Sequence, residues 1–178
     1  MYGLKTGKVV VHNSESQFPY QACAHYVLNK VFDQIKPYLD YQFIDIGCGK
    51  GRVLLVAQKY GFSSIIGIEM SKELTTLANI EIDKFGQSNS KVNIQAFCEN
   101  AIYFDYPNRD SVVFLFNPFD ANMLEKSLNT LLQKNKKEII LVYVNPVFSE
   151  IIGKFPFRKL NKVKTNFYTE AIIYRRIT

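Results

Sequence analysis

Two alternating hydrophobic patterns organise most of the chain. Continuous apolar runs, which are typical of buried strands, occupy residues 41–46, 63–69, 91–97, 111–116 and 138–144. Between these runs, apolar residues recur three or four positions apart, which predicts amphipathic helices. Strands that alternate with helices in this way predict a parallel sheet covered on both faces.

One further helix is predicted before the first strand, over residues 19–38, and it should end near Pro37. Ser71 and Asp120 are well placed to cap two of the later helices. The final segments, 157–163 and 168–176, are predicted to be strands joined as a hairpin. The inward faces of the four predicted helices comprise Cys23, Ala24, Val27, Leu28, Val31 and Ile35; Val53, Val56, Ala57 and Tyr60; Leu74, Leu77, Ala78 and Phe85; and Leu124, Leu128, Leu131 and Leu132. The predicted fold class is α/β, an open doubly wound sheet with one antiparallel element.

Length and composition predict one globular domain spanning residues 1–178. Apolar residues make up 47% of the 178 positions and charged residues 21%. The first residues lack the apolar stretch of a signal peptide, and no window approaches about 18 apolar residues. We therefore expect neither export nor membrane insertion, and a cytoplasmic location.

Cysteine and histidine are too sparse to suggest a metal centre or a disulfide framework. Cys23, Cys48 and Cys98 are odd in number and far apart, and they form no CxxC pair. His12 and His25 are the only histidines, and neither lies beside a plausible partner motif. We therefore expect no metal site and no catalysis based on a histidine base.

Positive charge is concentrated at the C-terminal end. The formal net charge of the whole chain is +6. Residues 154–178 contain seven basic residues and one acid, a net of +6, so residues 1–153 are neutral. Such a segment can bind phosphates, or it can be the solvated face of edge strands that lysines protect from aggregation.

The segment FIDIGCGKGR is the sharpest motif in the chain. Asp45 ends a strand, Gly47, Gly49 and Gly51 follow at alternate positions, and a helix comes next. Glycine permits positive φ and lets a ligand lie against backbone N–H groups. A dinucleotide GxGxxG motif would need glycine where Arg52 stands. Two plainer interpretations are a tight turn at the glycines and a capping or core role for the acid.

Two acids indicate which ligand this loop would take. The Asp45 carboxylate would repel a pyrophosphate and attract an ammonium or sulfonium group. Glu69, at the end of the second strand, is positioned to accept hydrogen bonds from both ribose hydroxyls. A ribose, a positively charged amino-acid tail and no pyrophosphate describe S-adenosylmethionine.

The segments FIDIGCGKGR, IIGIEMSKEL, VVFLFNPFD and ILVYVNP resemble the class I S-adenosylmethionine-dependent methyltransferases, in particular a family of small methyltransferases. The resemblance implies a Rossmann-like, three-layer α/β/α fold. It implies a seven-stranded sheet in the order 3-2-1-4-5-7-6, with the seventh strand antiparallel. It also implies that residues 1–40 form an N-terminal lid and helix, and that residues 41–178 form the core.

The same resemblance implies a set of cofactor contacts. Asn100 stands where the family has an acid that meets the adenine amine, and its amide oxygen can accept that hydrogen bond without charge assistance. Cys48 is expected to contribute through its backbone, with its thiol as a small filler. Asp45, Gly47, Gly49 and Gly51 are expected at the methionine end and Glu69 at the ribose. The full set of expected cofactor contacts is Asp45, Gly47, Cys48, Gly49, Gly51, Glu69, Met70, Asn100, Ala101 and Asn117.

The residues after the fourth strand carry the expected catalytic motif. Asn117, Pro118 and Phe119 resemble the NPP(Y/F) motif of amino-group methyltransferases, without its second proline. This implies that the asparagine oxygen and the backbone near the proline accept hydrogen bonds from the target nitrogen. The Phe119 ring would attract the developing ammonium. An ordinary turn and a core position for Phe119 are the alternatives, and Asn145 and Pro146 end the fifth strand in the same way.

The sequence therefore predicts a methyltransferase that acts on a nitrogen. A lysine-type protein amine is the first choice of acceptor, and a nucleic acid is the second because of the basic C-terminal segment. The alternative of another class is a catalytically silent module that binds S-adenosylmethionine. The oligomeric state stays open.

Overall fold

The computed structural model describes residues 25–86, 92–164 and 169–177. Cys23 and the predicted lid, which falls within residues 1–24, lie outside these ranges. Within them, no helix is both long enough and apolar enough to cross a membrane.

Helices and strands alternate along the chain as the hydrophobic pattern predicts. The helices are α1 (His25–Ile35), the 3₁₀ turn η1 (Lys36–Tyr38), α2 (Arg52–Tyr60), α3 (Lys72–Phe85), α4 (Ala121–Lys134) and α5 (Ser149–Ile152). The strands are β1 (Gln42–Ile46), β2 (Ser64–Glu69), β3 (Asn93–Cys98), β4 (Ser111–Phe116), β5 (Ile139–Val144), β6 (Phe157–Lys164) and β7 (Thr169–Arg176). Only α5, a single turn of four residues, was not predicted.

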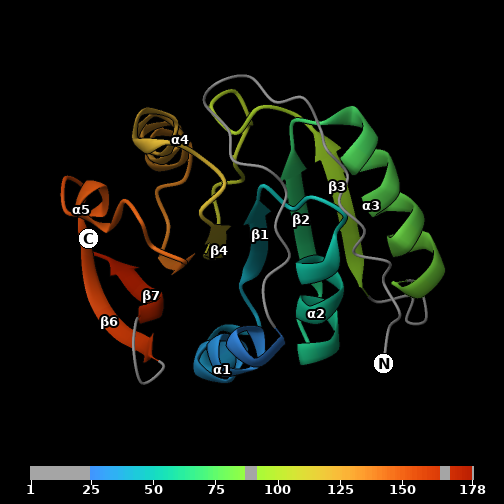
Figure 1. Cartoon of the computed structure of the whole chain (residues 1–178), viewed down its shortest axis with the longest axis horizontal. Coiled ribbons are helices and arrows are strands. Elements are labelled where there is room, and N and C mark those ends of the chain that lie inside the picture. Colours follow the sequence, from blue (N-terminus) through green and yellow to red (C-terminus); the bar gives the residue numbers. More distant parts are fainter. Residues whose placement is uncertain (1–24, 87–91, 165–168, 178) are drawn as a thin grey trace.

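All seven strands form one sheet in the order β3-β2-β1-β4-β5-β7-β6. The strands β1 to β5 are parallel, and β7 is antiparallel to both β5 and β6. This confirms the predicted sheet order and the antiparallel seventh strand. Parallel strands bring their carboxyl ends to one edge of the sheet, which is where ligands bind in folds of this kind (Figure 1).

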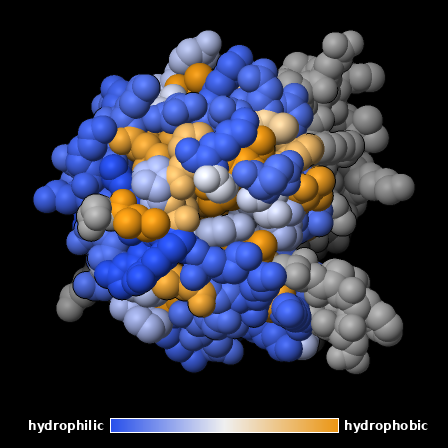
Figure 2. All heavy atoms as spheres, turned by 90° about the vertical axis from the view of Figure 1, so that its left-hand side faces the viewer, coloured by the Kyte–Doolittle hydropathy of each residue, from blue (hydrophilic) through white to orange (hydrophobic). Residues whose placement is uncertain are grey.

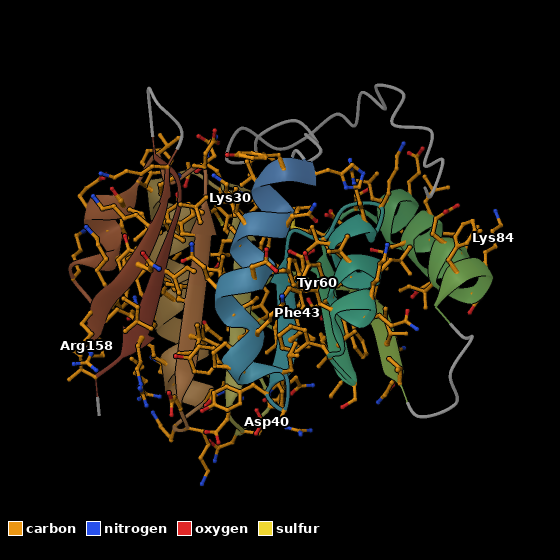
Figure 3. The ribbon with its side chains drawn as sticks, turned by 90° about the horizontal axis from the view of Figure 1, so that it is seen from below. Lys30, Asp40, Phe43, Tyr60, Lys84 and Arg158 are labelled. Carbon is orange, nitrogen blue, oxygen red and sulfur yellow. The ribbon has the colours of Figure 1, made fainter. Side chains whose placement is uncertain are left out.

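Helices pack on both faces of the sheet and make three layers. The first apolar cluster joins one face to α1, α2 and α3, and the second joins the other face to α4 and α5. At the centre of the first cluster, the Phe32 ring lies 5.5 Å from the Phe43 ring and 5.0 Å from the Tyr60 ring. Figure 3 shows Phe43 and Tyr60 in the region between α1 and α2. This packing anchors α1 to the middle of the sheet.

The predicted inward face of α3 needs one correction. Leu74 and Ala78 are buried as expected, but Phe85 is 39% exposed and Ile82 is buried in its place. Phe85 is the last residue of α3 and lies three positions past Ile82, off the four-residue spacing of the buried residues. The four-residue spacing from Leu74 to Ile82 defines the buried stripe.

Side-chain hydrogen bonds fix the ends of two helices and the outer edge of the sheet. Ser71 Oγ accepts from the Leu74 N–H at 3.3 Å, and Asp120 Oδ1 accepts from the Met123 N–H at 2.8 Å, so both predicted caps are confirmed. Asn79, on α3, donates to the Ala96 carbonyl at 2.9 Å and accepts from the Ala96 N–H at 3.0 Å. Asn79 thereby holds α3 against the edge strand β3.

Candidate functional site

The glycine-rich loop follows β1 at the carboxyl edge of the sheet. Gly47, Gly49 and Gly51 have φ values of 79°, 53° and 77°, all in the left-handed region that favours glycine. The Gly47 N–H donates to the Ile68 carbonyl at 2.8 Å, so the loop is tied to β2. The alternating glycines therefore meet a backbone requirement that other residues satisfy only with strain.

The loop also touches the turn that follows β4. A Cβ atom placed on Gly47 would lie 2.6 Å from the Cβ of Pro118. Carbon atoms do not approach this closely, so the contact depends on glycine at position 47. The two motifs that the sequence singled out are therefore adjacent in space.

Glu69 connects the glycine loop to the start of α3. Its Oε2 accepts from the Gly49 N–H at 3.1 Å, and its Oε1 accepts from the Ser71 N–H at 2.8 Å. Burial raises the pKa of the Glu69 carboxyl, while the N–H groups of Ser71 and Gly49 oppose that rise. The structure thus brings Glu69 to the glycine loop, and its binding of the ribose hydroxyls stays a prediction.

Asp45 lies within β1, two residues before the first glycine of the loop. It sits in register between Gly67 of β2 and Phe114 of β4, and only 2% of its surface is exposed. Its Oδ2 atom has no hydrogen-bond partner among the described residues. Burial, and secondarily the charge of Glu69, raise the pKa of the Asp45 carboxyl well above its usual range.

An unpartnered buried carboxylate costs free energy that a nearby cation or hydrogen-bond donor can offset. Asp45 therefore fits a ligand that carries an ammonium group. The arrangement is unfavourable for a pyrophosphate, since the buried Asp45 and the partly buried Glu69 are both acids.

The remaining predicted cofactor residues have different surroundings. The Cys48 thiol is buried and faces inward, because a Cβ on Gly67 would lie 2.7 Å from its sulfur. Met70 is 41% exposed, whereas Ala101 is buried. Asn100 Oδ1 accepts from the Ile102 N–H at 2.9 Å, so the amide oxygen already has one donor.

The turn after β4 begins with strained backbone. Asn117 has a φ of 39°, a left-handed conformation that is uncommon outside glycine. Its Oδ1 accepts a hydrogen bond from the Tyr143 hydroxyl at 2.9 Å. That hydroxyl also accepts from the Phe148 N–H, at 3.4 Å.

Sequence reasoning missed Tyr143. The available signal was a single hydroxyl within the apolar run EIILVYV, because a buried tyrosine usually needs a hydrogen-bond partner. Burial raises the pKa of Tyr143 to about 12. Its hydroxyl therefore stays protonated near neutral pH and can donate to Asn117.

Phe119 is a core residue in the structure. It is 8% exposed and belongs to the apolar cluster beneath α4. This position agrees with the core alternative for Phe119 and leaves little of its ring accessible to an acceptor.

A second Asn-Pro turn lies beside the first. Phe116 and Val144 are partners in the parallel pairing of β4 and β5, so Asn117 and Asn145 leave neighbouring strands at the same level. Asn145 also has a left-handed φ, 48°, and its side chain is exposed. Its backbone N–H donates to the Glu170 carbonyl at 2.8 Å, which ties this turn to β7.

Comparison with known proteins identifies the family. The family model described as a methyltransferase domain matches residues 39–171, and the chain therefore belongs to this family. Its domain is an S-adenosylmethionine-dependent methyltransferase domain.

One curated relative is a human protein named EEF1A lysine methyltransferase 2. The two sequences are 41% identical over 59 residues, which is 33% of this chain and 25% of the length of that relative.

Solved structures share the fold over most of their length. A putative methyltransferase from Escherichia coli has a TM-score of 0.69 at 17% identity, with coverage of 89% of this chain and 90% of that one. Magnesium protoporphyrin IX methyltransferase from Synechocystis, with bound S-adenosylmethionine, has a TM-score of 0.63 at 13% identity, with coverage of 89% and 87%. A ribosomal protein L11 methylase from Lactobacillus delbrueckii gives 0.64 at 16% identity, with coverage of 90% and 81%. At these identities the likeness concerns the fold.

Proposed function

We propose that this protein transfers the methyl group of S-adenosylmethionine to an amine nitrogen, with a lysine-type side chain of a protein as the acceptor. The observation that carries the proposal is the contact between Gly47 and Pro118. It places the Asn-Pro turn directly against the loop that would hold the methionine end of the cofactor.

The cofactor assignment rests on the chemistry of the residues around the loop. Asp45 would meet the ammonium group, because its buried Oδ2 has no other donor among the described residues. Glu69 would accept from the ribose hydroxyls through the lone pairs that Gly49 and Ser71 leave free. Asn100 and Ala101 would lie at the adenine, with Met70 beside the ribose. Cys48 would contribute only backbone, since its thiol faces the core.

The reaction needs alignment more than acid–base chemistry. When bound, S-adenosylmethionine would supply an electrophilic methyl carbon. The lone pair of the acceptor nitrogen would form a bond to this carbon, and the carbon–sulfur bond would break with both of its electrons passing to sulfur. An amine acceptor must be neutral when it attacks, and it afterwards loses a proton to solvent. Asn117 Oδ1 retains one lone pair beyond the Tyr143 bond and would orient the amine. Uncharged acceptors of this kind suit a nitrogen that becomes positive.

A protein lysine is favoured as the acceptor by one comparison. The human relative with 41% identity over 59 residues is named as a lysine methyltransferase. The departure of the Asn-Pro-Phe motif from the NPP(Y/F) pattern also argues against an adenine base.

A nucleic-acid acceptor is the second candidate, and the charges on β6 favour it. Of the seven basic residues in the C-terminal segment, three have partners: Lys154 pairs with Glu125, Arg175 with Glu138, and Arg176 donates to the carbonyls of Asn135 and Lys137. The other four, Arg158, Lys159, Lys162 and Lys164, are exposed and make no ion pair within the part of the chain that the structure describes.

These four residues lie on the outermost strand of the sheet. Arg158 extends away from this edge in Figure 3. In Figure 2, the face on this side of the molecule is largely hydrophilic around a smaller group of apolar residues. Such a surface would attract phosphates, and it would equally keep an edge strand soluble.

Transfer of radioactive label distinguishes these candidates. The purified protein is incubated with methyl-labelled S-adenosylmethionine and with separate protein and RNA fractions of a cell lysate, and Asn117→Ala serves as the control variant. If the label enters the protein fraction and is recovered as methyl-lysine after hydrolysis, the lysine acceptor is supported. If the label enters RNA, the nucleic-acid acceptor is supported. Tight cofactor binding without transfer to any fraction would instead indicate a silent binding module.

A further inference from the structure

The two Asn-Pro turns form a matched pair at the carboxyl edge of the sheet. Asn117 and Asn145 follow neighbouring strands at the same level, each with left-handed backbone and each followed by proline. Left-handed backbone at a residue other than glycine costs about 1–3 kcal/mol and persists where surrounding contacts enforce it. The question is which contact enforces it at Asn117.

The Tyr143 hydroxyl is the group that links the two turns. It donates to Asn117 Oδ1 in the first turn, and it accepts from the Phe148 N–H in the segment that follows the second turn. The Tyr143 side chain is 1% exposed, so its ring is fixed within the cluster beneath α4 and α5. One buried hydroxyl therefore sets both the orientation of the Asn117 amide and its position relative to the second turn.

We propose that Tyr143 is a positioning residue for methyl transfer, which acts by holding the Asn117 amide in the orientation that receives the acceptor nitrogen. This inference rests on the proposed function. Tyr143 does not itself touch the acceptor, because its ring is buried in the core. Its hydrogen bond occupies one lone pair of Asn117 Oδ1 and leaves the other for the amine.

Loss of the hydroxyl has a defined chemical consequence. In Tyr143→Phe, Asn117 Oδ1 loses the donor that fixes the amide, so the amide can rotate and present its NH₂ group to the acceptor instead. An NH₂ group repels the hydrogens of an amine. Methyl transfer should therefore slow while cofactor binding, whose main proposed contacts follow β1, β2 and β3, stays nearly the same.

A double-mutant cycle tests this coupling. Once a labelled fraction is identified, kcat and KM for it are measured for wild type, Tyr143→Phe, Asn117→Ala and the double variant, and affinity for S-adenosylhomocysteine is measured by calorimetry. We expect Tyr143→Phe to lower kcat about tenfold, a barrier change of about 1.4 kcal/mol. S-adenosylhomocysteine affinity should stay within twofold of wild type. The double variant should be no slower than Asn117→Ala alone.

Tyr174→Phe is the matched control. Tyr174 is buried in the same cluster and lies on the adjacent strand β7, but its hydroxyl makes no hydrogen bond to the described residues. It should leave kcat unchanged. An unchanged kcat in Tyr143→Phe, or independent effects of the two substitutions in the double variant, would overturn the inference alone. A wild-type protein that transfers label to no fraction would overturn the proposed function, and this inference with it.

Discussion

Gly47 and Pro118 are in such close contact that no side chain fits between them. A Cβ on Gly47 would lie 2.6 Å from the Cβ of Pro118, although the two residues follow different strands. The glycine loop and the Asn-Pro turn therefore pack directly against each other, and a substitution in one should change the conformation of the other.

Gly47→Ala should destabilise the fold and disturb the loop. The substitution introduces both a steric overlap with Pro118 and left-handed strain at φ 79°, and the combined cost is about 2 kcal/mol or more. Gly61→Ala is the control, because Gly61 also has positive φ, 112°, but its nearest neighbour would be the Leu39 side chain at 3.6 Å. Chemical denaturation should show the larger loss for Gly47→Ala. Equal losses in the two variants would mean that contact with Pro118 adds nothing.

Asp45→Asn should weaken binding of S-adenosylhomocysteine, which carries the same ammonium group as the cofactor. The raised pKa of Asp45 favours the protonated acid in the free protein, whereas an ammonium favours the carboxylate. Binding should therefore release protons and strengthen as pH rises. Calorimetry in two buffers of different ionisation enthalpy measures this release. We expect affinity to fall at least tenfold in the variant, with less proton release. Wild-type affinity in Asp45→Asn would refute the assignment.

Asp45 should also affect how the free energy of unfolding depends on pH. A carboxyl whose folded pKa is raised favours folding while protonated, and this contribution disappears as pH rises through the folded pKa. The free energy of unfolding of wild type should therefore decline more than that of Asp45→Asn as pH rises above about 4, the ordinary pKa of an aspartate side chain. Urea denaturation across this range measures the difference, and Asp40→Asn, at an exposed acid, controls for removal of a surface charge. If the free energy of unfolding depended on pH in the same way in wild type and Asp45→Asn, the pKa of Asp45 would not be raised in the folded protein.

Neutralising the four basic residues of β6 tests the second candidate function. Replacement of Arg158, Lys159, Lys162 and Lys164 by glutamine should weaken binding to a single-stranded RNA oligonucleotide. It should also reduce the slope of log affinity against log salt by about 3, at about 0.7 for each phosphate contact. The charge-matched control replaces four exposed lysines elsewhere: Lys59, Lys72, Lys126 and Lys137. If both quadruple variants bind RNA alike, the attraction is a property of net charge and not of β6.

The architecture could be predicted from the sequence because local patterns determine it. The buried run SVVFLF could only be a central strand, and it occupies 111–116 in the structure. The capping roles of Ser71 and Asp120 could be predicted from their residue types and from their positions just before the helices. The sheet order came from the resemblance to a known family, since strand pairing is non-local.

Features that depend on three-dimensional packing were harder to predict. The burial of Asp45 depends on Gly67 and Phe114, which flank it from neighbouring strands and lie 22 and 69 positions away in the sequence, and no local pattern encodes this. Phe85 was predicted to be a core residue because helical periodicity does not show which of two nearby apolar residues, Ile82 or Phe85, is the buried one. The bond between Tyr143 and Asn117 joins residues 26 positions apart, which a single sequence does not connect.

The side chain of Asn79 has a consequence for how molecules of this protein meet. It gives Ala96 both of the hydrogen bonds that an additional strand would supply. A strand from another copy therefore finds no free pair at the middle of β3, and the sheet is closed to growth there. At the opposite border, the lysines and arginine of β6 repel an identical neighbour. An amide occupies the hydrogen-bonding groups at the middle of one border, and like charges line the other, so both outer edges of the seven-stranded sheet disfavour the addition of a further strand.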